Sequence, residues 1–215
     1  MPTTAAVHLQ PSLFDDPGPA GPALGPLTGM RREALGPDAW VDLLPGWLHG
    51  ADRLFEQLAA EVPWWAERRE MYERTVEVPR LLASYREEDA PPHPVLGEAR
   101  AALSEHYARE LREPFRTLGL CYYRDGRDSV AWHGDRIGRG ASRDTMVAIL
   151  SVGEPRPLLL RPRGGGVPVL RHRLGHGDLL VMGGSCQRTW EHAVPKTARP
   201  VGPRISVQFR PRGVS

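Results

Sequence analysis

The chain has 215 residues, of which 40% are hydrophobic and 25% are charged, a composition typical of one folded globular domain with or without an appendage. No apolar run reaches the roughly 18 residues that a membrane-spanning helix needs. Acidic residues and prolines interrupt the N-terminal sequence where a signal peptide would be apolar. We therefore expect a cytoplasmic protein that makes no membrane contact. Two cysteines exclude a disulfide framework and a structural zinc site.

The formal net charge is +2, and Lys196 is the one lysine among 28 basic residues. Arginine suits phosphate contacts because its guanidinium is planar and bidentate. The arginines accompany 22 prolines and 23 glycines, as a GC-rich coding sequence would also produce. Charge by itself therefore identifies no partner.

Residues 1–30 are rich in Pro, Gly and Ala and have no periodicity, which indicates a flexible arm. A folded domain is then expected over residues 31–215. Its first part, about 31–113, contains the helical patterns, and its second part, about 114–215, has the texture of a β-rich core.

Apolar residues at helical spacing predict one helix over 51–62 and a longer one over 95–112, which ends before Pro114. The segment between the two helices mixes aromatic and charged residues. We expect it to form strands or a loop excursion.

After Pro114, short apolar runs alternate with Gly, Pro and Asp, which favour turns. The seven runs are TLGLCYY, SVAWH, TMVAILSVG, PLLLRPR, PVLRHRL, DLLVMGG and RISVQFR. No helical period lies between them, so the sequence predicts a β-sandwich or barrel. The glycines at 164–166 predict a hairpin turn. The expected fold class is mostly β with flanking helices (α+β).

One histidine has an informative neighbour. In Trp132-His133-Gly134-Asp135 the imidazole and the carboxylate are two positions apart, so in an extended segment they project to the same face. They could supply two ligands of a 2-His-1-carboxylate site, which leaves positions open on an Fe(II) ion. The alternative is an ordinary His–Asp hydrogen bond.

The C-terminal run supplies context, because residues 204–210 alternate strictly between apolar and polar side chains. As a strand, this segment would place Arg204, Ser206, Gln208 and Arg210 on one face, where they could bind a carboxylate. The alternative is an exposed polar face on an edge strand. Upstream, His192 offers a second histidine ligand from a different segment.

From about residue 62 to residue 212 the chain resembles the AlkB-type family of Fe(II)- and 2-oxoglutarate-dependent dioxygenases. The resemblance rests on YYRDGRDSVAWHGD, AILSVGEPRPLLLRPRGGG, GDLLVMGGSCQRTWEHAVPK and GPRISVQFR, which occur in the family's order. It implies a double-stranded β-helix, or jelly-roll, core with supporting helices. It also implies Fe(II) as cofactor, with 2-oxoglutarate and O2 as cosubstrates.

The resemblance assigns roles to residues at matching positions. His133, Asp135 and His192 would bind the iron and form the catalytic centre. Arg204 and Arg210 would hold the carboxylates of 2-oxoglutarate. The remaining cosubstrate positions are those of Tyr123, which would add a hydrogen bond, and of Ser206 and Cys121.

On the substrate side, the family acts on N-alkylated bases such as 1-methyladenine and 3-methylcytosine, which it flips out of the strand and demethylates, releasing formaldehyde, succinate and CO2. The segment WWAERREMYERTVEVPRLLASY resembles the family's nucleotide-recognition lid. Its candidate substrate contacts are Trp65, Tyr72, Arg80 and Tyr85. Trp64 competes with Trp65 for the match, and these aromatics could instead pack the lid onto the barrel.

Several positions depart from the family pattern. Cys121 and Ser206 replace the usual asparagines, and Gln208 replaces the usual threonine. Arg136-Ile137 follows the HxD motif where many members carry an acidic pair, whose second acid contacts the base. These departures leave the base identity open.

We therefore expect a monomeric oxidative demethylase of alkylated DNA, with RNA as a further possible substrate. The alternatives are the same oxygenase chemistry on RNA, a nucleotide or a small metabolite, and a non-catalytic nucleic-acid-binding relative. A zinc hydrolase fits less well, because a carboxylate-binding arginine pair has no role in activating water.

Overall fold

The computed structural model of the protein describes residues 21–71, 74–134 and 139–214. Within them the strands form two sheets and a small ribbon, and all of their strand pairs are antiparallel. The larger sheet has the order β2 (Arg31–Ala34), β3 (Ala39–Leu44), β12 (Asp178–Gly184), β9 (Val147–Gly153), β14 (Arg204–Arg210), β7 (Thr117–Tyr123), β6 (Arg74–Tyr85) and β5 (Trp65–Met71). The smaller sheet has the order β11 (Leu170–Leu174), β10 (Arg156–Pro162), β13 (Trp190–Val194) and β8 (Val130–His133). The ribbon pairs β1 (Ala23–Leu24) with β4 (Leu48–His49).

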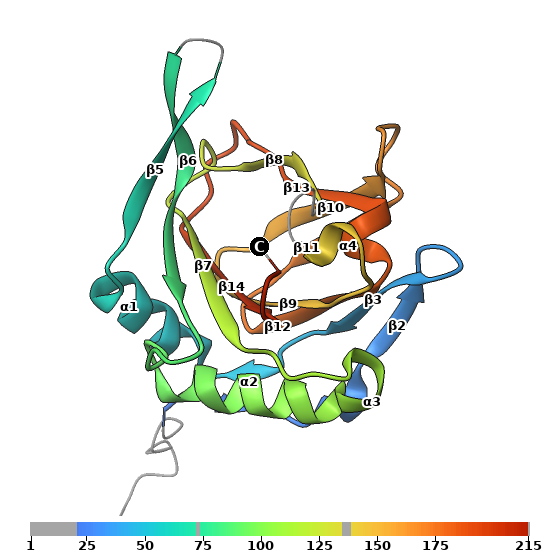
Figure 1. Cartoon of the computed structure of the whole chain (residues 1–215). Coiled ribbons are helices and arrows are strands. Elements are labelled where there is room, and N and C mark those ends of the chain that lie inside the picture. Colours follow the sequence, from blue (N-terminus) through green and yellow to red (C-terminus); the bar gives the residue numbers. More distant parts are fainter. Residues whose placement is uncertain (1–20, 72–73, 135–138, 215) are drawn as a thin grey trace, which may run out of the picture.

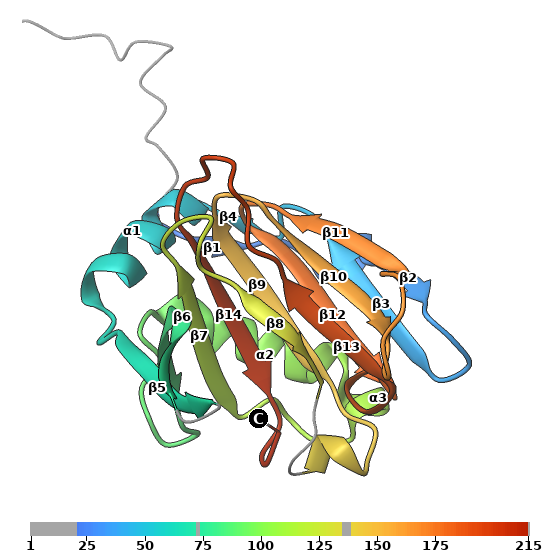
Figure 2. The same ribbon diagram turned by 90° about the horizontal axis from the view of Figure 1, so that it is seen from above.

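The smaller sheet lies over the larger one, and together they enclose a barrel-like core (Figure 1). Viewed from above, strands of the smaller sheet cross above β14, β9 and β12 (Figure 2). A cluster of buried side chains between the sheets, among them Ile149, Leu160 and Leu180, fills this space. The predicted mostly-β, jelly-roll fold class is confirmed.

Two helices cover the outer face of the larger sheet, α1 (Ala51–Glu61) and α2 (Pro94–His106) (Figure 1). Their apolar stripes pack with outward-facing residues of β9, β14 and β7 in a second buried cluster. No helix in the described segments is long and apolar enough to cross a membrane. The remaining short helices are η1 (Leu27–Gly29), α3 (Ala108–Leu111), η2 (Arg139–Ala141) and α4 (Cys186–Thr189).

The first predicted helix is confirmed, and the second is interrupted. The expected helix over 95–112 begins at Pro94 and ends at His106, and α3 follows after Tyr107. The buried Tyr107 hydroxyl donates to Asp42 Oδ2 on β3 at 2.8 Å. The interruption therefore lies where the helix is tied to β3, next to the edge strand of the larger sheet.

All seven predicted strand runs after Pro114 are strands, and the glycines at 164–166 form the turn between β10 and β11. Their φ angles of 98°, 107° and 103° lie in the left-handed region that favours glycine. The segment between the helices forms the β5–β6 hairpin, which projects from one edge of the barrel (Figure 1). Sequence patterning missed β2 and β3, which extend the larger sheet.

The predicted boundary between arm and domain at residue 30 is too late. Ala23 and Leu24 pair with His49 and Leu48, and Leu24 and Leu27 pack against the outer core cluster. Only ten residues of the predicted arm are affected, namely 21–30; the preceding residues, 1–20, lie outside the described part of the chain. Composition misled here because Pro and Gly also occur in short extended segments that cover a core.

Strand β9 is buried on both faces, because one face meets the helices and the other meets the smaller sheet. Leu150 belongs to the outer cluster and is 0% exposed. Leu150→Ala should therefore lower the free energy of unfolding by about 2–5 kcal/mol, since it leaves a cavity that the packed sheet cannot close.

Urea unfolding followed by circular dichroism measures this loss. Val167→Ala, at a position that is 82% exposed, is the matched control and should change the free energy by less than about 0.5 kcal/mol. Equal effects of the two substitutions would contradict the described burial.

Candidate metal and anion site

A cavity between the two sheets contains most of the residues that the sequence singled out. Its lining comes from strands of both sheets and from one residue of helix α4. The residues are Arg80, Cys121, Tyr123, Val130, His133, Val147, Ile149, Leu158, Gln187, His192, Val194, Arg204, Ser206, Gln208 and Arg210. The polar members gather into a histidine group on the smaller sheet and an arginine group on the larger sheet.

The histidine group joins two neighbouring strands. His133 at the end of β8 and His192 on β13 are paired residues of the ladder, and their ring centroids are 4.1 Å apart. Nδ1 of His133 lies 2.9 Å from the carbonyl oxygen of Ala131. Because a carbonyl can only accept, this nitrogen carries the proton, and the lone pair on Nε2 can bind a metal.

The surroundings of both rings favour the neutral form that binds metal. Loss of hydration lowers the pKa of His133, and the positive charge of Arg80 acts in the same direction. Burial, His133 and Arg210 together lower the pKa of His192 well below its ordinary value.

Gly134 follows His133 where β8 passes close to another segment. A Cβ at this position would lie 2.5 Å from the carbonyl oxygen of Trp190, which is too short for any other residue without a backbone shift. The next residue, Asp135, lies outside the described residues, as do Arg136 and Ile137. The described residues contain no cluster of three potential metal-ligating side chains, so the two histidines are the ligands that the structure places together.

The arginine group confirms the predicted alternation of β14. Ile205, Val207 and Phe209 pack into the outer cluster, whereas the intervening polar residues line the cavity. Strand β14 is thus buried on both faces and is not an edge strand of its sheet.

Arg204 is the most deeply buried cation of this group, at 2% exposure. Its Nε donates to Ser151 Oγ at 2.9 Å, and its Nη1 has no hydrogen-bond partner in the described part of the chain. Its guanidinium carbon lies 5.4 Å from the ring centroid of Tyr123. Burial raises the pKa of Tyr123 to about 12, so its hydroxyl stays protonated and can donate. A buried donor without a partner is costly, and an acidic ligand would satisfy it.

The other cavity-facing residues of β14 contact β7. Gln208 Nε2 donates to Ser206 Oγ at 2.6 Å, and Cys121 Sγ lies 3.7 Å from Gln208 Oε1. Arg210 extends over Gly119, where a Cβ would collide with its Nη1. Gly119 therefore provides the space in which the Arg210 guanidinium lies.

Comparisons with known proteins agree with this arrangement. A model of the 2OG-Fe(II) oxygenase superfamily matches residues 41–210. Alpha-ketoglutarate-dependent dioxygenase alkB homolog 3 of Mus musculus is 33% identical over 95% of this chain and 76% of its own length. The chain belongs to the AlkB-type family of 2-oxoglutarate- and Fe(II)-dependent dioxygenases. DNA oxidative demethylase ALKBH2 of Homo sapiens is 27% identical over 90% of this chain and 80% of its own length.

Among solved structures, that of OsALKBH1 superposes with a TM-score of 0.56 at 17% identity, covering 83% of this chain and 100% of the other. At this identity the likeness shows a shared fold. An AlkB-type dioxygenase uses Fe(II), 2-oxoglutarate and O2, and the cavity fits these groups. It has two histidines with lowered pKa values on one wall, and on the other a buried guanidinium whose Nη1 has no partner among the described residues.

The predicted substrate contacts are distributed over different surroundings. Arg80 lines the AlkB-type cavity and donates from Nη1 to the carbonyl oxygen of Ser129 at 3.2 Å. Trp65 is 47% exposed on β5, outside the cavity lining, whereas Trp64 packs with Tyr122 at a centroid distance of 5.2 Å. Tyr72 lies outside the described residues.

Tyr85 does not reach the cavity. It pairs with Leu118 on β7 and packs against the outer core cluster, so the structure does not bring it together with the other candidates. The resemblance aligned a Pro-Arg…Tyr pattern, but Tyr85 lies five positions after Arg80 on the same strand. An odd spacing in a strand puts two side chains on opposite faces.

Sequence reasoning missed two residues near the cavity, Gln187 and Arg156. Gln187 is buried and its Nε2 has no partner in the described segments. Arg156 shares a strand face with Leu158 and Leu160, both of which are buried. A charged residue in phase with inward-facing leucines was the signal that could have identified it.

The two cysteines should differ in reactivity. Burial raises the pKa of Cys186 to about 12, so at pH 8 almost none of it is the nucleophilic thiolate. Cys121 lines the cavity and is the thiol that we expect to react with DTNB in the folded protein. Release of thionitrobenzoate by the Cys121→Ser and Cys186→Ser variants measures each site. Rapid labelling of Cys121→Ser before unfolding would contradict the described burial of Cys186.

Proposed function

We propose that this AlkB-type dioxygenase oxidatively demethylates N-alkylated bases of nucleic acid, with DNA carrying 1-methyladenine or 3-methylcytosine as the first substrate class. This proposal rests chiefly on one observation: His133 and His192 line the same cavity as Arg204. The buried Nη1 of Arg204 has no partner in the described residues. The names of two relatives, a DNA oxidative demethylase and an alkB homolog, support the choice of substrate.

His133 and His192 would hold the iron, with Asp135 as the third ligand that the HxD motif supplies. A 2-His-1-carboxylate set leaves positions open for a cosubstrate and O2. Bound Fe(II) and 2-oxoglutarate would supply the oxidising chemistry that hydroxylates an N-methyl group, which is then lost as formaldehyde while 2-oxoglutarate becomes succinate and CO2. The hydrogen bond from His133 Nδ1 to the carbonyl oxygen of Ala131 fixes the tautomer, so that Nε2 keeps the lone pair that would bind the metal.

The arginine group would orient 2-oxoglutarate. Arg204 would offer its Nη1, and Tyr123 its protonated hydroxyl, to one carboxylate, while the charge of Arg210 lowers the pKa values of both histidines. Ser206 and Cys121 line the wall between these two ends. Charge-assisted hydrogen bonds of this kind give a dicarboxylate a single orientation.

The apolar part of the lining, from Val130, Leu158 and Val194 among others, would exclude water from the reacting methyl group. On the substrate side, Arg80 reaches the cavity from the projecting β5–β6 hairpin, and Trp65 offers an exposed ring on the same hairpin. An exposed aromatic ring is suited to stacking on a base. Tyr72, which lies between β5 and β6 in the sequence, remains a proposed substrate contact.

A second candidate keeps the oxygenase chemistry and changes the substrate to RNA, a nucleotide or a small metabolite. The observation that favours it is in the sequence: Ile137 stands where a base-contacting acid is usual in the family. An aliphatic side chain cannot hydrogen-bond a flipped base.

Demethylation can be tested with a short single-stranded DNA that carries one 3-methylcytosine, incubated with the protein, Fe(II), 2-oxoglutarate, ascorbate and air. Mass spectrometry should show loss of the methyl group with the wild-type protein. His133→Ala should abolish turnover, since the remaining ligands hold a labile Fe(II) poorly. His106→Ala, an exposed histidine at the end of α2, is the matched control and should retain activity.

Each result has a defined meaning. Succinate formed without methyl loss would overturn the proposed DNA substrate and favour the second candidate. Full activity of His133→Ala would overturn the metal assignment. If the wild-type protein forms no succinate and binds no metal, the non-catalytic relative would be favoured.

Arg204→Ala should raise the KM for 2-oxoglutarate about tenfold or more, because a lost charge-assisted hydrogen bond is worth roughly 1.5–3 kcal/mol. Steady-state succinate formation at varied 2-oxoglutarate measures the change. Arg199→Ala, which removes an exposed arginine, should leave KM within twofold, a margin of about 0.4 kcal/mol. An unchanged KM in Arg204→Ala would place the carboxylate elsewhere.

A further inference from the structure

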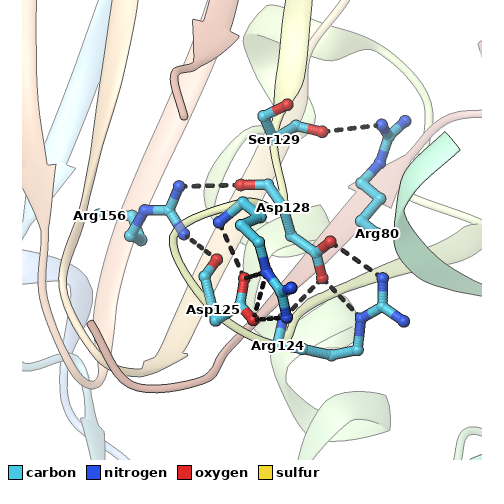
Figure 3. A network of polar contacts seen from close by, with 7 residues as sticks. Arg80, Arg124, Asp125, Asp128, Ser129 and Arg156 are labelled. Carbon is cyan, nitrogen blue, oxygen red and sulfur yellow. Dashed lines mark hydrogen bonds and ion pairs between the residues drawn. The ribbon is translucent and has the colours of Figure 1, made fainter. Parts of the chain in front are cut away.

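Arg156 is the least exposed arginine of the described chain, at 1%, and lies at the start of β10. Its guanidinium donates from Nη1 to the carbonyl oxygen of Asp125 and from Nη2 to those of Asp128 and Pro195, each at 2.9 Å. Figure 3 shows this guanidinium directed at the backbone of the segment that contains Asp125 and Asp128. All three acceptors are main-chain oxygens.

These three oxygens belong to the segments that lead into and out of the histidine strands. The Asp125–Asp128 turn directly precedes β8, which ends at His133, and Pro195 directly follows β13, which carries His192. Since β8 and β13 are antiparallel, both segments lie at the same end of the pair. One side chain therefore joins the two strands that present the proposed metal ligands.

The β8–β13 ladder has little support of its own. In the described residues its register has two pairs, His192 with His133 and Val194 with Val130, and an irregularity lies between them. Strand β8 is four residues long and is an edge of its sheet. A short, irregular edge pair depends on contacts outside its ladder to keep its spacing.

The same turn is also joined to the proposed substrate side. Ser129 N–H donates to the carbonyl oxygen of Pro79 at 2.7 Å, and Arg80 Nη1 donates to the carbonyl oxygen of Ser129 at 3.2 Å. Arg80 and Arg156 thus contact neighbouring carbonyls from opposite sides (Figure 3). Moving the turn would move the start of β8 and the anchor of Arg80 together.

The bonding pattern requires arginine and not merely a positive charge. No ion pair in the described part of the chain includes Arg156, because the carboxylate of Asp128 pairs with Arg124 and that of Asp125 with Arg127. A planar guanidinium can address three carbonyls in fixed directions, whereas a lysine ammonium is a compact point charge. Retaining the charge alone would leave at least part of this arrangement unmade.

We propose that Arg156 is a positioning residue that holds β8 and β13 in the spacing required for His133 and His192 to share one metal ion. The part that concerns metal rests on the proposed function. The part that concerns the strands is independent of it.

Two variants separate geometry from charge. Arg156→Lys keeps a cation of similar length, and Arg156→Met keeps length without charge. Arg171→Met, at an exposed position on β11, controls for the loss of one arginine. Each full-length variant is first measured without metal by amide hydrogen exchange, and then titrated with Co(II) in the presence of 2-oxoglutarate while the visible Co(II) bands are recorded.

Both Arg156 variants should exchange amides faster than wild type in peptides covering 124–133 and 190–195, with α2 unchanged. Both should bind Co(II) on the order of tenfold more weakly, the usual cost of losing support around a metal site, and with altered bands. Arg171→Met should match wild type. If Arg156→Met does not fold, the same amide-exchange and Co(II) measurements are made on Arg156→Lys at low temperature.

Unchanged exchange in the 124–133 and 190–195 peptides of Arg156→Lys would overturn the positioning role. Wild-type Co(II) affinity and bands in Arg156→Lys would also overturn it, since charge would then suffice. Absence of Co(II) binding by the wild-type protein, with exchange altered as expected in the variants, would instead reject the proposed metal site and leave the strand-positioning role intact.

Discussion

Two arginine side chains, Arg156 and Arg204, are buried in the barrel with no ion pair in the described part of the chain. A buried charge is tolerated only where hydrogen bonds replace its hydration. Arg156 makes three such bonds, all to main-chain carbonyls, and only its Nε has no partner in the described residues. Arg204, which lines the cavity, makes one such bond, to Ser151, and its Nη1 has no partner in the described residues. The barrel therefore holds one cation that organises the chain and one that is ready to bind an anion.

The cost of this polar interior is offset by burial elsewhere. Strands β9, β12 and β14 are covered on both faces, by α1 and α2 outside and by the smaller sheet inside. The alternation of β14 depends on that double cover, since Val207 contributes to the outer core while Ser206 and Gln208 line the cavity. A helix layer on the outer face thus allows the inner face to carry charged and hydrogen-bonding side chains.

The proposed metal site lies where the fold is least regular. His133 and His192 come from strands joined by a short, shifted ladder, and Gly134 lets the chain pass close to Trp190 immediately before Asp135. Irregular strand ends direct side chains that a straight ladder would not bring together. This region is supported by hydrogen bonds of Arg156 to the main-chain oxygen of Asp128 and by hydrogen bonds of the Ser129 backbone. Because backbone groups take part in each of these bonds, no sequence motif marks them.

The sequence by itself determined the seven C-terminal strands, the first helix and the two faces of β14, because the periodicity of side chains is a local property of the chain. It also named His133 and His192 as candidate ligands, whereas their pairing on neighbouring strands came from the structure. Only the tertiary structure decided that Trp64 packs into the core while Trp65 is exposed, that Tyr85 points away from the cavity, and that residues 21–30 belong to the domain. It also revealed Arg156, whose three acceptors are backbone oxygens. Such contacts depend on which segments meet in space, and any residue can supply a carbonyl, so composition and spacing carry no record of them.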